Sequence, residues 1–301
     1  LSELHHRALD WCSSLRLSAP YGNEKLFPGA NPVTRPIVNR RTMGFLIRRF
    51  VMRIVVALLV LFSLPLHADE IRLSDDLQVS PLTQHTWVHR SWEVIQGQRY
   101  PSNGLIIVEE KALTLIDTAW GDTPTALLLD WIEQQFGKVP DRAILTHSHD
   151  DRMGGARTLA ERGIPAWAHP ATLALARNDP DTFYDPDIPL PRLLKAFTEQ
   201  SRITFANLEL YYPGPAHSPD NILVWYARDE VLIGGCAVKG GSATAIGHVE
   251  GSDASHWPVA MDNVLAHYGD ASIVVPGHGD IGDASLLTHT RNLAARALEN
   301  P

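Results

Sequence analysis

The sequence predicts an α/β fold in which mixed sheets are covered by helices. Strand-like runs and helical segments interleave through both halves of residues 69–301. Some strand-like runs are joined by tight turns and others by helices, which indicates antiparallel and parallel pairing in the same fold. An apolar content of 45% suits a packed core, and neither a sequence repeat nor a long linker divides this region. We therefore expect a layered α/β sandwich.

The first half of this region begins with a hairpin. Apolar residues 104–108 and 112–116 flank the turn Glu109-Glu110-Lys111. A helix is expected to follow, with Thr123 as N-cap, Pro124 in its first turn and Gly137 at its end. The elements expected next are a strand over 142–146, a helix over 156–162, a strand over 165–168, a helix over 171–177 and a Pro- and Asp-rich loop over 178–191.

The second half continues the alternation. The expected strands are 208–212, 222–226, 231–233 and 272–275, and the expected helices are 254–268 and 284–298. Because strand ends and loops can gather at one edge of such a sandwich, we expect a functional site there.

Residues 1–68 differ in character from the rest. From Met52 the chain reads Met-Arg, an apolar run over 54–66 and a small residue at 68, the pattern of a secretory signal peptide. The run is too short to span a membrane comfortably. We expect 1–51 to be an upstream segment outside the native fold, 52–68 to be a signal peptide and 69–301 to be a single exported, periplasmic domain. A genuine N-terminal extension and an earlier start at Met43 are the alternatives.

Charge and cysteine content narrow the possible partners. Without residues 1–68 the chain keeps 17 Lys and Arg against 31 Asp and Glu, a net charge of −14. Such a chain is a poor candidate for binding nucleic acid or an anionic membrane surface. Cys236 is the only cysteine of this part, so it cannot form an internal disulfide.

The segment His147-Ser148-His149-Asp150-Asp151 follows the strand expected over 142–146. Alternation along a strand sends residues i and i+2 to the same side, so both imidazoles can bind one ion such as Zn²⁺. Asp151 is placed for a second ion or for a metal-bound water. The alternative is a polar turn in which Asp151 caps the next helix.

Three more candidate ligands each follow a strand and are flanked by Gly or Pro: His217, Cys236 and His278. Glycines there let the backbone approach a metal closely. Taken singly, the cysteine could be buried core and the histidines solvated. Together they predict two sets of three ligands, each with an open coordination position: His147, His149 and His217 for one ion, and Asp151, Cys236 and His278 for another.

The sequence resembles the metallo-beta-lactamases of subclass B1 over essentially all of residues 69–301. The resemblance rests on Ile116–Trp120, Thr146–Gly155, Gly214–His217, Gly234–Lys239 and Pro276–Gly279. Glyoxalase-like hydrolases and subclass B3 enzymes carry His where this chain has Arg152, and subclass B2 replaces the first His by Asn. The resemblance implies a four-layer αβ/βα sandwich with a dizinc cleft at one edge of the two sheets.

The activity implied is zinc-dependent hydrolysis of the β-lactam ring of penicillins, cephalosporins and carbapenems, which confers antibiotic resistance. A zinc-bound hydroxide would attack without a covalent intermediate, and Asp151 would orient it. The resemblance implies two zinc ions per chain and a monomer whose partner is a small molecule. The alternatives are a thioesterase or phosphodiesterase on the same fold, or a non-catalytic periplasmic zinc-binding protein.

The resemblance also assigns roles around the metals. Lys239 would bind the substrate carboxylate, unless it is a solvated surface lysine. Asp117 would orient ligands or cap backbone amides, and Arg152 would lie behind the second metal.

Trp92 would belong to a hairpin over 92–98 that closes over substrate or packs on the core. His248 stands where many B1 enzymes have an Asn that polarises the lactam carbonyl, and it could donate that hydrogen bond or point to solvent. The other histidines are expected to be ordinary: His85, His89, His169, His256, His267 and His289.

Overall fold

The computed structural model describes residues 70–178, 192–193, 200–247 and 251–299. The chain divides into two units, Leu1–Leu66 and His67–Pro301, and every described residue belongs to the second unit. The segments predicted over 1–51 and 52–68 and nearly all of the loop predicted over 178–191 therefore lie outside the described residues. Within the described ranges, no helix is both long and apolar enough to cross a membrane.

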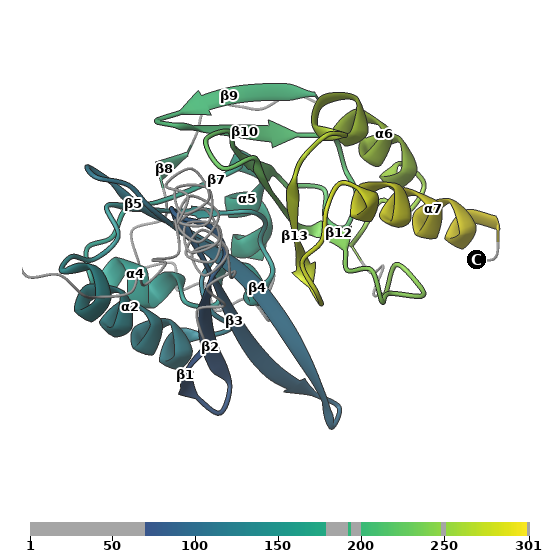
Figure 1. Ribbon diagram of the computed structural model, residues 1–301. Helices are drawn as coiled ribbons and strands as arrows, with labels where there is room; N and C mark the ends of the chain where they lie inside the picture. Colours follow the sequence, from purple (N-terminus) through teal and green to yellow (C-terminus); the bar gives the residue numbers. More distant parts are fainter. Residues whose placement is uncertain (1–69, 179–191, 194–199, 248–250, 300–301) are drawn as a thin grey trace, which may run out of the picture. The chain divides into compact units, whose positions relative to one another are not determined.

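Two sheets form the centre of the unit (Figure 1). The first sheet follows chain order: β1 (Ile71–Ser74), β2 (Leu77–Pro81), β3 (Thr86–Ile95), β4 (Gln98–Val108), β5 (Leu113–Ile116), β6 (Arg142–Leu145), β7 (Ala166–Ala168) and β8 (Arg192–Leu193). The second runs β13 (Ile273–His278), β12 (Val231–Lys239), β11 (Leu223–Tyr226), β10 (Leu208–Tyr212) and β9 (Ser201–Phe205).

Both sheets are mixed, as predicted. The β4–β5 hairpin is antiparallel, whereas β5, β6, β7 and β8 pair in parallel. In the second sheet β12 and β13 are parallel and the other pairs are antiparallel. The helices that accompany the sheets are α2 (Asp122–Phe136), α3 (Asp150–Met153), α4 (Ala156–Glu161), α5 (Pro170–Asn178), α6 (Trp257–Tyr268) and α7 (Ser285–Glu299).

Alternation along the strands produces three apolar layers. In β4, Leu105 and Ile107 pack in the cluster between the two sheets, whereas Ile106 packs with Leu128 of α2. In β12, Leu232 packs in the cluster formed with α6 and α7. Burying a side chain of this size stabilises the fold by about 1.5–3 kcal/mol. The order of layers is therefore helix, sheet, sheet, helix, which confirms the αβ/βα sandwich.

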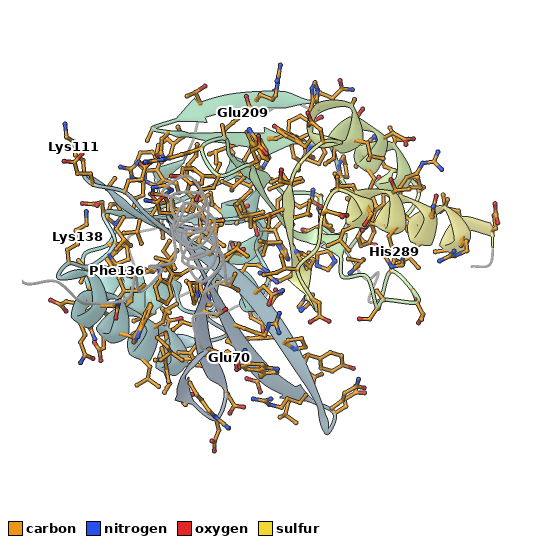
Figure 2. All side chains as sticks on the ribbon, viewed as in Figure 1. Glu70, Lys111, Phe136, Lys138, Glu209 and His289 are labelled. Carbon is orange, nitrogen blue, oxygen red and sulfur yellow. The ribbon has the colours of Figure 1, made fainter. Side chains whose placement is uncertain are left out.

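Charged side chains lie mainly on the outside of these layers. Lys111, at the exposed turn between β4 and β5, projects away from the sheet (Figure 2). The turn closes with a hydrogen bond from Glu109 N to Ala112 O at 2.9 Å, as expected for the predicted hairpin.

Two helix starts differ from the prediction. Helix α2 begins at Asp122, and its N-cap is Gly121 with a positive φ of 101°, so Thr123 is not the cap. A β-branched residue avoids that backbone region, whereas glycine adopts it freely. Helix α6 begins at Trp257 because Asp253 forms the preceding turn and accepts a hydrogen bond from His256 N at 3.0 Å.

Candidate metal centre

The candidate metal ligands come from both sheets and from the segments that follow their strands. His147 and His149 follow β6, and His217 lies in the loop between β10 and β11. The end of β6 is joined to the start of β11 by a hydrogen bond from Ile222 N to Thr146 O at 2.8 Å. The chain therefore brings the histidines of two separate motifs to the same place.

The first predicted ligand set is compact. His217 Nε2 lies 3.1 Å from His149 Nδ1, and the ring centroids of His147 and His149 are 4.5 Å apart. One ring nitrogen of each histidine lies within 4.8 Å of the others. His147 is fully buried and His217 is 8% exposed. The three histidines predicted as one ligand set therefore bring their ring nitrogens together in the fold.

The protonation and bonding of these rings fit a metal site. Burial lowers the pKa of His147 and of His217 well below the usual value, and nearby positive groups lower both further. Both ring nitrogens of His147 and Nδ1 of His217 are buried without a hydrogen-bond partner among the described residues. An unpaired buried polar group costs about 1–3 kcal/mol, and such groups are rare in native proteins. Neutral imidazoles with free lone pairs are ligands that Zn²⁺ prefers.

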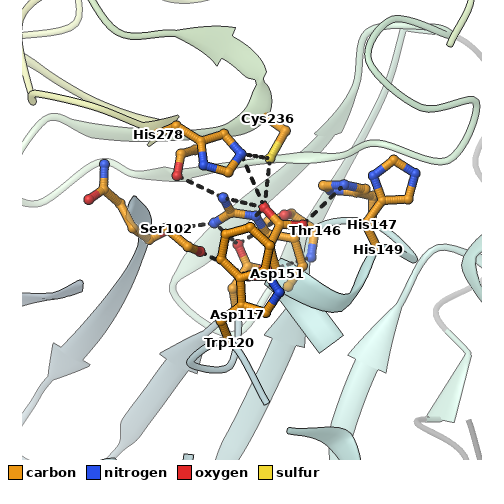
Figure 3. A network of polar contacts seen from close by, with 12 residues as sticks. Ser102, Asp117, Trp120, Thr146, His147, His149, Asp151, Cys236 and His278 are labelled. Atoms are coloured by element: carbon orange, nitrogen blue, oxygen red, sulfur yellow. Dashed lines mark hydrogen bonds and ion pairs between the residues drawn. The ribbon is translucent and has the colours of Figure 1, made fainter. Parts of the chain in front are cut away.

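The second predicted set lies next to the first (Figure 3). Cys236 Sγ is 3.1 Å from Asp151 Oδ2 and 3.2 Å from His278 Nε2. His278 Nε2 is 3.3 Å from the same carboxylate oxygen. The other oxygen, Asp151 Oδ1, lies 3.9 Å from His147 Nε2. The Asp151 carboxylate therefore touches the second set with one oxygen and faces the first with the other.

The structure excludes the helix-capping alternative for Asp151 and corrects the predicted placement of Cys236 after a strand. Asp151 does not cap a helix, because α3 begins at Asp150 with His149 as N-cap and no side-chain cap bond. Cys236 does not follow the end of its strand, because β12 continues to Lys239. The glycines before Cys236 mark irregular register in β12 rather than its end, and Gly235 has a positive φ of 51°.

Arg152 is fully buried beneath the second set. Its Nε donates to Asp151 Oδ2 at 3.0 Å, and its Nη1 lies 3.3 Å from Asp117 Oδ2. Burial alone would raise the pKa of Asp151, but Arg152 and His278 outweigh it and hold that pKa well below the usual range. Conversely, the neighbouring acidic groups raise the pKa of Arg152 against the effect of its burial. Asp151 is thus held ionised, as a metal ligand must be.

Asp117 supports the end of β6. It accepts hydrogen bonds from Thr146 N at 2.7 Å and from Thr146 Oγ1 at 2.9 Å, directly before His147. Burial raises the pKa of Asp117 to about 6 in spite of Arg152. The two alternatives considered for Asp117 are compatible: its carboxylate binds a backbone amide and, through Thr146, fixes the start of the histidine motif.

The end of β13, which carries His278, is held by Arg152 and by Asn103, for which the sequence predicts no role. Arg152 Nη2 donates to Gly277 O at 2.7 Å, and Asn103 Nδ2 donates to Pro276 O at 3.0 Å and to Gly279 O at 2.8 Å. Ser102 Oγ also donates to Asp151 O at 3.0 Å. The only sequence signal was a polar pair, Ser102-Asn103, directly before an apolar strand run.

Lys239 lies at the end of β12, next to the metal centre. Its Nζ is 5.0 Å from the centroid of the Trp257 ring, and the residue is half-buried. Burial lowers the pKa of Lys239, while Cys236 and Asp151 oppose that shift. Lys239 is therefore half-buried beside the candidate site rather than fully solvated, and its contact with a substrate carboxylate stays a prediction.

The hairpin of β3 and β4 has an exposed apolar tip. Val94 is 57% and Ile95 is 44% exposed, whereas Trp92 is half-buried with the Arg99 guanidinium 4.3 Å from its ring centroid. Gln96 and Gly97 form the turn with positive φ values of 51° and 81°, which matches a type I′ turn. The predicted contact of Trp92 with substrate stays a prediction, and His248 lies outside the described residues.

Among the histidines expected to be ordinary, His85 has a partner that the sequence did not reveal. Its Nδ1 lies 2.8 Å from Asp229 Oδ1, far along the chain. His89 is buried with its Nε2 3.3 Å from Ile116 O. Neither lies in the two ligand sets.

A helix–sheet–sheet–helix sandwich with a histidine-rich ligand cluster built from both sheets is typical of metal-dependent enzymes of the α/β class. The profile of the Metallo-beta-lactamase superfamily matches residues 97–278. The chain belongs to this superfamily.

Relatives of known structure and sequence agree with that membership. Metallo-beta-lactamase type 2 of Bacillus cereus is 37% identical over 72% of this chain and 82% of its own length. A solved metallo-beta-lactamase from Pontibacter korlensis is 33% identical, with a TM-score of 0.65 over 73% of this chain and 99% of that chain. The metallo-beta-lactamase FIM-1 from Pseudomonas aeruginosa, solved in a mono-zinc form, is 28% identical, with a TM-score of 0.68 over 76% of this chain and 100% of that one.

Proposed function

We propose that this protein hydrolyses the β-lactam ring of penicillins, cephalosporins and carbapenems with Zn²⁺ as cofactor, and that it thereby confers antibiotic resistance. The observation that carries the proposal is the meeting of the three-histidine set with the set of Asp151, Cys236 and His278, in which the Asp151 carboxylate faces both sets. Six ligands in two open sets suit catalysis better than storage, which favours closed coordination. Two features favour subclass B1: Cys236 offers a soft sulfur ligand, and position 152 holds Arg rather than the metal-ligating His of subclass B3.

The residues present fit zinc in both places. His147, His149 and His217 would hold one ion, and Asp151, Cys236 and His278 would hold the second. Bound zinc supplies Lewis acidity, which brings the pKa of a coordinated water to about 7 and polarises a carbonyl. Nitrogen and sulfur donors favour zinc over Mg²⁺ or Ca²⁺, which take oxygen ligands.

Asp151 orients the attacking water. Its carboxylate is ionised and is fixed by Arg152, so Oδ1 stays on the side of the three histidines. An acceptor in that place can take a hydrogen bond from the nucleophile and align it for attack on the lactam carbonyl. In this scheme water is the nucleophile, so the lactam ring opens without a covalent bond between enzyme and substrate.

Lys239 binds the substrate carboxylate. It is a cation at the site of a chain whose proposed mature part has a net charge of −14, so it supplies local attraction for an anion. The tip residues Val94 and Ile95, with Trp92, contact apolar substituents of the substrate.

His248 donates a hydrogen bond to the lactam carbonyl or points to solvent. Turnover by His248→Ala that is unchanged between pH 5.5 and 8 would exclude the first role.

The proposed setting is the periplasm, with the protein acting as a monomer on a small molecule. The support for the location is the signal-peptide pattern over 52–68. The acidic charge of residues 69–301 disfavours nucleic acid and anionic membranes as partners.

The deciding experiment is to purify the protein, measure zinc per chain, and assay a penicillin, a cephalosporin and a carbapenem before and after chelation. We expect about two zinc ions per chain and hydrolysis that is lost on chelation and restored by Zn²⁺. Two bound zinc ions without turnover of any lactam would contradict the proposed activity and leave the fold assignment intact.

A further inference from the structure

Trp257, the first residue of α6, connects separate parts of the site. Its side chain is fully buried, and its indole Nε1 donates to Ala237 O at 2.9 Å. Ala237 directly follows Cys236 in β12. The indole therefore holds the strand that carries both the cysteine and Lys239.

The face and edge of the same ring meet two functional side chains. Lys239 Nζ lies 5.0 Å from the ring centroid, within the range of a cation–π interaction. The His217 ring lies at a centroid distance of 5.8 Å and an interplanar angle of 62°. One rigid side chain thus touches the proposed carboxylate-binding cation and a proposed zinc ligand.

The start of α6 is also fixed to the loop that carries His217. Asp253 N donates to Ala216 O at 3.0 Å, and His256 Nδ1 lies 3.0 Å from Pro215 O. Further along the helix, Asn263 Nδ2 donates to Pro213 O at 3.0 Å. The place of the indole relative to this loop is therefore set by hydrogen bonds as well as by packing.

We propose that Trp257 is a positioning residue that fixes the Lys239 ammonium relative to His217 and so sets the affinity of the site for the substrate carboxylate. Lysine has a flexible four-carbon stem, and burial disfavours its charge. The aromatic face restricts the stem and stabilises the cation in one place. This inference rests on the proposed function, because Lys239 must bind an anionic substrate for the position of its ammonium to matter.

The test compares benzylpenicillin with its methyl ester, which lacks the carboxylate. Trp257→Leu removes the aromatic face, and we expect the KM for benzylpenicillin to rise roughly 3- to 30-fold. The KM for the ester should stay within about twofold, because no anion is recognised. Trp257→Phe keeps a weaker aromatic face, so we expect a smaller rise for the acid and again none for the ester.

A double-mutant cycle tests whether Trp257 acts through Lys239. In a Lys239→Met background, Trp257→Leu should no longer raise the KM for benzylpenicillin. Zinc per chain and the thermal midpoint are measured for each variant. If Trp257 acted only in core packing, its replacement would lower the thermal midpoint and the fraction of active protein. It would then not raise the KM for benzylpenicillin more than the KM for the ester.

Distinct outcomes overturn the two claims. Equal increases in KM for acid and ester, or an undiminished effect in the Lys239→Met background, would show that Trp257 does not position the cation. If Trp257→Leu does not fold, the Trp257→Phe comparison decides by the same criterion. A zinc-loaded parent that hydrolyses neither compound would instead contradict the proposed function, and this inference with it.

Discussion

Arg152 shows how a single residue determines the arrangement of the site. Its guanidinium contacts two buried carboxylates, Asp117 and Asp151, and the carbonyl of Gly277 at the end of β13. The sequence placed Arg152 behind the second metal because it occupies the position of a ligand in related enzymes. The sequence could not reveal Asp117 and Gly277 as partners, because they lie 35 and 125 positions away along the chain and meet Arg152 only when it folds.

Replacing Arg152 tests this network. Arg152→Ala leaves two buried carboxylates without their cation, and we expect the free energy of unfolding to fall by about 3–5 kcal/mol. Arg152→Lys keeps the charge but not the planar set of donors, so the loss should be smaller. Urea unfolding measures both. The control is Arg162→Ala, which removes an exposed ion pair with Asp130 and should cost at most about 1 kcal/mol. Equal losses for Arg152→Ala and Arg162→Ala would contradict the network.

His89 makes stability depend on pH. Burial lowers its pKa to about 4 from the ordinary 6.5 of the unfolded chain. Between those values the unfolded state binds a proton that the folded state does not, so stability present above pH 6.5 is lost as pH falls toward 4. The loss reaches about 2–3 kcal/mol. We expect His89→Gln to show a shallower decrease in unfolding free energy between pH 7 and 4.5. Parallel curves for parent and variant would show that His89 does not contribute.

At the scale of elements, the regular apolar segments were predictable and the irregular ones were not. β5, β6, β10 and α7 follow clear apolar patterns and lie close to their predicted ranges. β3 was predicted only at its end, as part of the hairpin over 92–98, because its earlier part mixes polar residues such as His89 and Arg90 with apolar ones. The end of β12 was misplaced because Gly234 and Gly235 are typical of a strand end. A side chain at Gly234 would meet Val238 at 2.3 Å, so the glycine is needed within the strand.

Gly277 allows β12 and β13 to approach at the second ligand set. A Cβ added there would lie 2.7 Å from Cys236 N and 2.7 Å from Cys236 Sγ. We therefore expect Gly277→Ala to displace Cys236 and to reduce zinc from about two to about one per chain, measured after dialysis by metal analysis. Gly241→Ala is a matched control, because its added Cβ meets only Leu286 Cδ2 at 3.5 Å. Full zinc content in Gly277→Ala would contradict the close approach.

Changes at the exposed tip of the β3–β4 hairpin should affect substrate binding and leave the free energy of unfolding almost unchanged. Because Val94 and Ile95 are exposed, changing both to Ser should alter the free energy of unfolding by less than about 0.5 kcal/mol. We expect the KM to rise several-fold for lactams with large apolar substituents and to change little for those with small ones. Steady-state kinetics on both kinds of substrate measure the difference. An equal change for both would show that the tip does not contact the substituent.

At the scale of the whole molecule, the ligand sets span the two sheets. His147, His149 and Asp151 come from the segment after β6, and His217, Cys236 and His278 come from the second sheet and its loops. The six positions could be predicted because each has a local signal, a ligand residue beside a strand. The supports from Asn103 and Trp257 could not, because they depend on how the layers pack.

This arrangement predicts that metal removal loosens both sheets at one edge. A ligand present at 100 times its Kd stabilises the folded state by about 2.7 kcal/mol. For a domain of this size, that corresponds to a decrease in Tm of roughly 5–10 °C on chelation. Because the cluster between the sheets is built from apolar side chains such as Leu105, Val224 and Ile233, the chelated protein should stay folded by near-ultraviolet circular dichroism. Amide hydrogen exchange should become faster at the ends of both β6 and β12, and Zn²⁺ but not Mg²⁺ should reverse the change. Faster exchange in only one sheet would show that the metals do not join the two layers.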